Sequence, residues 1–134
     1  MKLLVDSHCL IWSVCDVGKI PLPVQAALKE PANRVLVSAV SLWEIALKHA
    51  LGKLALAGIT PDQLREAALH MGFELLSLAP EDAASSSSLP RFGHKDPFDR
   101  MLAWQAIRGD YQLVSCDADL AAYSAHGLRL YWPK

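Results

Sequence analysis

Short apolar runs alternate with longer segments of helical spacing along the whole chain. Residues 2–5 are mostly apolar and favour extended backbone, and the run stops at Asp6, so they predict a buried strand. Residues 8–14 then place apolar side chains at the spacing of a helix face. The same reasoning predicts further strands at 34–37, 73–78, 112–115 and 128–131, and further helices at 24–29, 38–51, 60–71, 80–84, 96–108 and 118–125.

Capping signals support several of these helix boundaries. Thr60 and Asp96 each precede a proline, the order expected for an N-cap and the first helical residue, and Gly52 and Gly72 are suited to end helices. Strands and helices alternate from end to end, which predicts an α/β fold with a mostly parallel sheet and helices on both faces. Because no repeat or boundary interrupts the pattern, we expect residues 1–134 to form a single domain.

Composition narrows the class of protein. Hydrophobic residues make up 52% of the chain and charged residues 20%, which favours a buried core over disorder. No apolar run reaches the roughly 18 residues that span a bilayer, so we expect a cytoplasmic protein without a membrane partner. The net charge of −1 argues against strong non-specific nucleic-acid binding, but not against a nuclease, because catalytic acids lower the net charge. Cys9, Cys15 and Cys116 lack the spacing of a zinc site, and we expect reduced thiols.

Four acidic residues fall at one edge of the predicted sheet. Asp6 directly follows the first strand, and Asp117 lies two residues past the fourth. Glu44 and Asp99 lie in the opening turns of two predicted helices. Ligands bind outside the carboxyl ends of parallel strands, and helices that leave those ends begin at the same edge, so we expect the four carboxylates to converge.

Each acid also has a purely structural interpretation. The three aspartates could cap helices, form turns or oppose a helix dipole. Glu44 could complete a capping box with Ser41 or pair with Lys48. As a set, however, two carboxylates ~5 Å apart repel by roughly 3 kcal/mol at an effective dielectric constant of ~20. Four of them must take up protons or bind a cation, and all-oxygen ligands suit Mg²⁺ or Mn²⁺.

Polar neighbours of the acids provide further candidates. Serines at the strand ends could hold waters or orient carboxylates, or serve only as local caps. Basic residues around the third acid could contact RNA phosphate, or belong to a solvated loop. Asp96 is interpreted as an N-cap rather than a metal ligand. The serines are Ser7, Ser38 and Ser115, and the basic residues are Arg91, Lys95 and Arg100.

Four motifs carry the four acids. They are residues 4–12 (Leu-Val-Asp-Ser-His-Cys-Leu-Ile-Trp), 38–46 (Ser-Ala-Val-Ser-Leu-Trp-Glu-Ile-Ala), 94–102 (His-Lys-Asp-Pro-Phe-Asp-Arg-Met-Leu) and 113–120 (Leu-Val-Ser-Cys-Asp-Ala-Asp-Leu). In this order they resemble PIN-domain ribonucleases, specifically the VapC toxins of bacterial toxin–antitoxin pairs, over essentially the whole chain. The resemblance assigns catalysis and metal binding to Asp6, Glu44, Asp99 and Asp117.

The resemblance also implies a fold, an activity and partners. The fold is a three-layer α/β/α arrangement around a five-stranded sheet, and the activity is Mg²⁺-dependent (or Mn²⁺-dependent) cleavage of RNA by a toxin. The implied partners are an antitoxin, which inserts a peptide into the active site, and a second copy of the chain. The fourth motif departs mildly from the family pattern, with Ser115 in place of threonine, and Asp119 could add or substitute a carboxylate there. Apolar residues that could form the dimer surface, or equally the core, are Leu42, Trp43, Leu47, Leu51, Leu54 and Leu56.

Two other classes of function compete with the ribonuclease. Phosphatases with an aspartate nucleophile also place an aspartate after the first strand, but they resemble Asp-x-Asp there, and this chain has His8 at the second position. A non-catalytic interaction module would use the same acids as caps and surface charge. Binding of Mg²⁺ or Mn²⁺ distinguishes this module from the ribonuclease.

Overall fold

A central sheet of five parallel strands, in the order β3-β2-β1-β4-β5, organises the molecule. The computed structural model describes residues 1–91 and 96–133. All pairings between neighbouring strands are parallel, and Val5 of the central strand pairs with Val37 on one side and Val114 on the other. The strands are β1 (Lys2–Val5), β2 (Arg34–Ser38), β3 (Glu74–Leu76), β4 (Gln112–Val114) and β5 (Arg129–Leu130).

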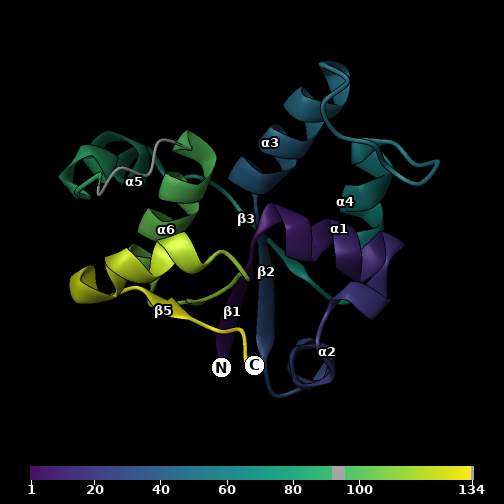
Figure 1. Ribbon diagram of the computed structural model, residues 1–134, viewed down its shortest axis with the longest axis horizontal. Coiled ribbons are helices and arrows are strands. Elements are labelled where there is room, and N and C mark those ends of the chain that lie inside the picture. The colour runs from purple at the N-terminus through teal and green to yellow at the C-terminus, as the bar shows by residue number, and fades with distance from the viewer. Residues whose placement is uncertain (92–95, 134) are drawn as a thin grey trace.

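Helices cover both faces of the sheet, which confirms the predicted three-layer α/β/α fold (Figure 1). One face carries α1, α2 and α4, and the other carries α5, α6 and η3, while α3 contributes to both cores. None of the helices in the described ranges is long and apolar enough to cross a membrane. The helices are α1 (Ser7–Cys15), α2 (Leu22–Lys29), α3 (Ala39–Ala50), α4 (Pro61–His70), α5 (Pro80–Ser85) and α6 (Pro97–Gly109), with 3₁₀ segments η1 (Val17–Lys19), η2 (Ser86–Ser88) and η3 (Ala118–His126).

The central strands are apolar on both faces because each face has its own hydrophobic core. Leu3 and Val5 enter the core beneath α1, α2 and α4, whereas Leu4 enters the core beneath α6 and η3. β2 alternates in the same way. Successive side chains of a strand point to opposite faces, so a continuous apolar run is what a sheet covered on both sides requires. Burial on both faces fixes where these strands end. It therefore also fixes the position of the residues that follow them.

Local signals account for most helix boundaries, with one correction. Thr60 caps α4 in a capping box with Gln63, and Gly72 follows α4 with a φ of +88°, a conformation that favours glycine. Helix α3 begins at Ala39, and its N-cap is Ser38, whose hydroxyl accepts a hydrogen bond from the Val40 N–H at 3.0 Å. The alternative interpretation of Ser41 and Glu44 as a capping box is therefore wrong, because the helix starts one turn earlier. Glu44 is left available for other contacts.

Candidate metal centre

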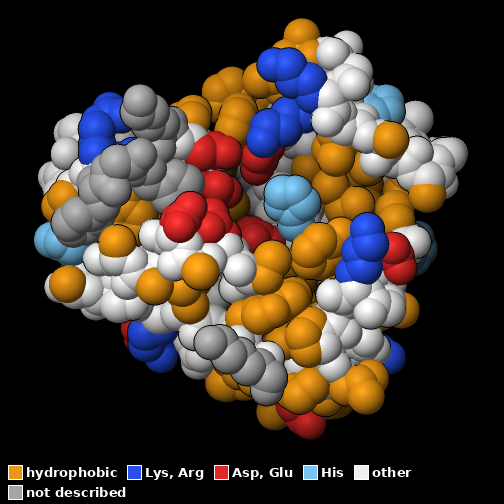
Figure 2. Space-filling model, in the orientation of Figure 1, with side chains coloured by type: hydrophobic (Ala, Val, Ile, Leu, Met, Phe, Trp, Pro, Cys, Tyr) orange, Lys and Arg blue, Asp and Glu red, His pale blue; other side chains and the backbone are white. Residues whose placement is uncertain are grey.

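Three neighbouring strands deliver acidic residues to the carboxyl edge of the sheet. Asp6 directly follows β1 and caps α1, Glu44 lies on α3 just after β2, and Asp117 follows β4 and caps η3. Asp99 lies in the first turn of α6. In Figure 2, acidic side chains gather in a hollow at the centre of this face, between α3 and α6.

The charges of the other acids act on Asp99. Its pKa is raised to about 7, first by burial and then by the negative charges of Asp96, Glu44, Asp117 and Asp6. A carboxyl group with a pKa near neutrality, surrounded by other carboxylates, is an arrangement expected at a functional site rather than on an ordinary helix surface. Of the four acids chosen from the sequence, Asp6, Glu44 and Asp117 are thus close enough to act on the charge of the fourth, Asp99.

Asp96 belongs to the same cluster, which the sequence interpretation did not include. It is the N-cap of α6, as expected, and accepts hydrogen bonds from the N–H groups of Phe98 and Asp99. In addition, one carboxylate oxygen each from Glu44, Asp96 and Asp99 lie within 4.8 Å of one another. The spacing of three residues between Asp96 and Asp99, at the start of one helix, was the signal that could have indicated a shared site.

Asp6 is buried and rigidly held. Its side chain is an N-cap that accepts the Cys9 N–H at 2.7 Å, and its own backbone N–H donates to the Val114 carbonyl at 3.1 Å. Burial raises the pKa of Asp6, while the hydrogen bonds from Cys9 and from the Ser115 hydroxyl lower it. The structural interpretation of Asp6 as a cap is therefore correct, and it is compatible with a metal ligand because a carboxylate has several lone pairs.

Glu44 is only 4% exposed, and both of its oxygens have partners. The Ser7 hydroxyl donates to Oε1 at 2.5 Å, and the Lys48 ammonium donates to Oε2 at 2.5 Å. The hydrogen bond to Glu44 is the main cause that raises the pKa of Lys48. Ser7 thus contacts a candidate ligand, and Lys48 lies at the site as a cation that the sequence suggested only as an ordinary helix pair.

The other predicted neighbours divide into those near the acids and those with other partners. The Ser115 hydroxyl accepts the Asp117 N–H at 3.1 Å and bonds to Asp6. Asp119 is exposed, its N–H donates to Asp117, and it is not among the charges that shift Asp99. These contacts favour Asp117 over Asp119 as the fourth acid. The Ser38 hydroxyl instead donates to the Gln105 side chain at 2.5 Å.

The basic residues offered as phosphate contacts have different surroundings. Arg91 is exposed, and Lys95 lies outside the described residues. Arg100 is half-buried, and its two terminal nitrogens donate to the Leu89 and Pro90 carbonyls and to the Tyr123 hydroxyl, each at 2.9 Å. These bonds tie the chain before α6 to η3. They give Arg100 a structural role and leave little of its guanidinium for RNA.

Replacing Arg100 with methionine is expected to lower the free energy of unfolding by about 2–4 kcal/mol, because two carbonyls and a hydroxyl lose a charged donor. Urea denaturation monitored by circular dichroism measures this loss. The matched control is Arg91→Met at an exposed position, with an expected change within about 0.5 kcal/mol. If Arg100→Met leaves stability unchanged but weakens RNA binding, Arg100 is a phosphate contact after all.

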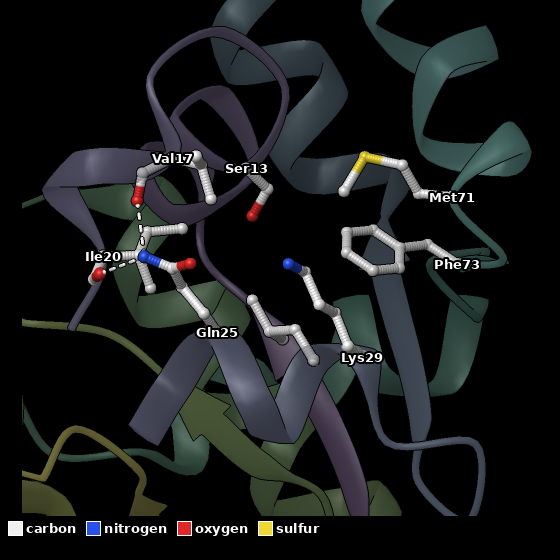
Figure 3. A pocket seen from close by; sticks show the side chains of 8 residues that line it. Ser13, Val17, Ile20, Gln25, Lys29, Met71 and Phe73 are labelled. Atoms are coloured by element: carbon white, nitrogen blue, oxygen red, sulfur yellow. Dashed lines mark hydrogen bonds between the residues drawn. The ribbon is translucent and has the colours of Figure 1, made fainter. Parts of the chain in front are cut away.

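A separate pocket of about 300 Å³ lies between α1, η1, α2 and the end of α4 (Figure 3). At the edge of the pocket, the side-chain amide of Gln25 donates hydrogen bonds to the carbonyls of Val17 and Ile20. The Lys29 ammonium points into the pocket. Among the residues that the structure describes, those that line the pocket include no carboxylate, cysteine or histidine. Its lining residues are Ser13, Val17, Ile20, Gln25, Leu28, Lys29, Met71 and Phe73.

The acidic cluster fits a hard divalent ion. The donors of Glu44, Asp96 and Asp99 are all carboxylate oxygens, and Glu44 is buried, as is the neighbouring acid Asp6. Hard cations such as Mg²⁺ and Mn²⁺ prefer such ligands, whereas no cysteine or histidine joins the cluster in the described part of the chain to favour zinc. A bound dication would relieve the repulsion that raises the pKa of Asp99.

Comparison with solved structures returns the same fold in several toxin–antitoxin complexes. VapBC2 from Rickettsia felis, bound to a promoter DNA fragment, matches with a TM-score of 0.67 and 14% identity over 99% of this chain and 100% of that chain. VapBC-1 from nontypeable Haemophilus influenzae matches with a TM-score of 0.66 and 17% identity over 98% and 97%. DNA-bound VapBC from Salmonella typhimurium matches with a TM-score of 0.65 and 18% identity over 98% and 97%.

Comparison of the sequence itself gives a family. No curated protein matches the chain. The family model described as the PIN domain matches residues 3–125, which include all four of the predicted acids. The match covers β2, β3, β4 and all but the first residue of β1, and it ends before β5. The chain therefore belongs to the PIN domain family.

Proposed function

We propose that this protein is a divalent-metal-dependent endoribonuclease, a VapC-like toxin that acts in the cytoplasm with a cognate antitoxin. The observation that carries the proposal is the convergence of Glu44, Asp96 and Asp99 at the carboxyl edge of the sheet, with Asp6 and Asp117 close enough to shift Asp99. PIN domains are generally nucleases, and the solved structures of the same fold include toxin–antitoxin complexes. Mg²⁺ is the favoured ion, and Mn²⁺ would serve as well.

The described side chains supply defined parts of a phosphodiester hydrolysis. Asp6, Glu44, Asp99 and Asp117 would hold the ion, which supplies Lewis-acid stabilisation of the phosphate and a more acidic water. The Cys9 N–H and the Ser7 hydroxyl fix Asp6 and Glu44, so these ligands need no reorganisation before reaction. In the metal-free chain the pKa of Asp99 is about 7, so near neutral pH this carboxyl group would release its proton when it becomes a metal ligand.

The experiment that tests this function is RNA cleavage by the purified protein. Single-stranded RNA should be cut in Mg²⁺ or Mn²⁺ and left intact after chelation, while a DNA of the same sequence should be cut far more slowly. Asp6→Asn should remove cleavage without unfolding the protein, since asparagine can still accept the Cys9 N–H. Cleavage that persists at full rate in EDTA, or in the Asp6→Asn protein, would rule out the proposed mechanism.

The competing functions are less well supported by the site. An aspartate-nucleophile phosphatase needs a second acid two residues after Asp6, and that position is the exposed His8. A non-catalytic interaction module does not require buried acids that repel one another. Formation of an aspartyl-phosphate at Asp6 would favour the phosphatase. Absence of Mg²⁺ and Mn²⁺ binding would favour the interaction module.

Helix α3 provides an exposed apolar stripe for the proposed homodimer. Trp43, Leu47 and Leu51 follow one another at intervals of four residues and are 63%, 38% and 59% exposed. Residues at this spacing lie on one side of a helix. The other three candidates, Leu42, Leu54 and Leu56, are partly buried against the core, so the predicted set divides between surface and core.

The double substitution Leu47→Glu with Leu51→Glu is expected to convert a dimer into a monomer, because charges replace the apolar surface of α3. Sedimentation velocity gives the mass directly. The control is Leu22→Glu on α2, which is 77% exposed and lies away from this stripe, and it should leave the dimer intact. A dimer that survives the double substitution places the interface elsewhere.

A further inference from the structure

Lys48 places its ammonium group among three carboxylates of the acidic cluster. The Nζ atom lies 2.5 Å from Oε2 of Glu44 and 4.0 Å from Oδ2 of Asp96. The negative charge of Asp99 also acts on it. The ammonium group is therefore positioned at the same acids that form the candidate metal centre.

This contact differs from an ordinary ion pair on a helix surface. The side chain of Glu44 is only 5% exposed, whereas partners of surface pairs are both solvated and contribute little. Lys48 also reaches across to α6, where it approaches Asp96 and lies 5.8 Å from the centre of the Phe98 ring. The ammonium is thus held between α3 and α6, over a buried acid, by contacts from both helices.

The position of Lys48 offsets the repulsion between carboxylates in the metal-free protein. Carboxylates at such short separations repel one another strongly in a partly buried site. A single positive charge among them reduces this repulsion. However, the Lys48 ammonium donates to Oε2 of Glu44 and the Ser7 hydroxyl donates to Oε1, so a metal ion that binds Glu44 competes with one of these two partners. Lysine has a flexible four-carbon stem, so the charge can withdraw toward solvent without a change in the backbone.

We propose that Lys48 is an internal counterion of the metal centre, which pairs with Glu44 and Asp96 in the metal-free protein and is displaced from Glu44 when a divalent ion binds. The inference rests on the proposed metal site, and it does not depend on RNA as the substrate. It adds a positioning residue to the site, since Lys48 acts through the carboxylates rather than on the reacting phosphate. It also implies that metal affinity is set partly by competition within the protein.

Calorimetric titration with Mn²⁺ in the absence of RNA tests the proposal. Lys48→Met keeps the length of the side chain and removes its charge, and it should bind Mn²⁺ about tenfold more tightly than the parent protein, a difference of about 1.4 kcal/mol. The matched control is Lys53→Met, which removes the same charge from an exposed position five residues later and should stay close to the parent affinity. Unchanged or weaker binding by Lys48→Met overturns the proposal, as does a parent protein that binds no Mn²⁺.

A second measurement uses the unaltered protein and does not depend on a variant that folds. The ammonium of Lys48 can be followed by nitrogen-15 magnetic resonance of the lysine side chains during a titration with Mg²⁺. We expect slow hydrogen exchange without metal and faster exchange, with a changed shift, at saturation. An ammonium signal that is unchanged at saturating Mg²⁺ overturns displacement. RNA cleavage with Mg²⁺ can persist in that case, so failure of this inference is distinct from failure of the proposed function.

Discussion

Replacing Asp99 with asparagine is expected to abolish RNA cleavage and to make the metal-free protein more stable near pH 8. Loss of one ligand should weaken Mn²⁺ binding by about 100-fold or more. It should reduce cleavage by about a thousandfold, which corresponds to roughly 4 kcal/mol of lost transition-state stabilisation. The gain in stability follows because asparagine removes an ionised group that burial and four neighbouring acids disfavour. It should amount to about 2 kcal/mol after allowance for solvent screening.

The opposite effects of Asp99→Asn on activity and on stability distinguish a metal ligand from a residue with a purely structural role. If Asp99 only capped or supported α6, its replacement would lower stability and leave metal affinity unchanged. Calorimetric titration and thermal unfolding of the same preparation measure both quantities. The control is Asp110→Asn, an exposed aspartate at the far end of α6 in a left-handed conformation that asparagine tolerates, and it should leave both unchanged.

The stability of the metal-free protein is expected to fall as the pH rises from about 4 to about 7. The pKa of Asp99 is about 7 in the folded chain against 3.8 ordinarily, so the folded protein retains a proton that the unfolded chain releases. The free energy of unfolding then decreases by up to about 1.4 kcal/mol per pH unit for this group. Asp6 has the same sign, since its pKa is also raised by burial. Above about pH 8 the decrease should level off, because Asp99 is ionised in both states.

Saturating Mg²⁺ should restore the stability that is lost at high pH. A ligand that binds only the folded state stabilises it in proportion to its occupancy, and protons on Asp99 compete with the metal at low pH. The increase in melting temperature caused by Mg²⁺ should therefore be larger near pH 8 than near pH 6. Asp99→Asn should flatten the dependence on pH and remove most of the response to Mg²⁺. An equal response to Mg²⁺ at both pH values would contradict the role assigned to Asp99.

The strands, their parallel direction and the edge of the sheet that carries the acids could be predicted from the sequence, whereas the order of the strands was not. The apolar runs at 2–5, 34–37 and 112–115 become β1, β2 and β4, which lie side by side in the sheet. Asp6 follows β1 directly and Asp117 lies shortly after β4, so their location required only the rule that parallel strands end at a common edge. The helix starts at Ser38 and Asp96 were likewise visible as local capping signals.

Residues that act across the fold could not be assigned from local patterns. Asp96 has a sufficient local explanation as a cap, and only the packing of α3 beside α6 brings it close to Glu44 and Lys48. The same holds for Arg100, whose carbonyl partners are set by the path of the chain before α6. Ser38 looked suited to the acidic edge but turns its hydroxyl to Gln105. In each case a long-range contact, absent from the sequence pattern, decides the role.

The central claim, that carboxylates at this edge hold a divalent ion, is tested most directly by the anomalous scattering of Mn²⁺ in crystals of the protein. The account predicts a single strong peak, or two close peaks, within coordination distance of Asp6, Glu44 and Asp99, with the Lys48 ammonium moved away from Glu44. Crystals saturated with Mn²⁺ that show no peak at these residues, while the same protein cleaves RNA, would contradict it.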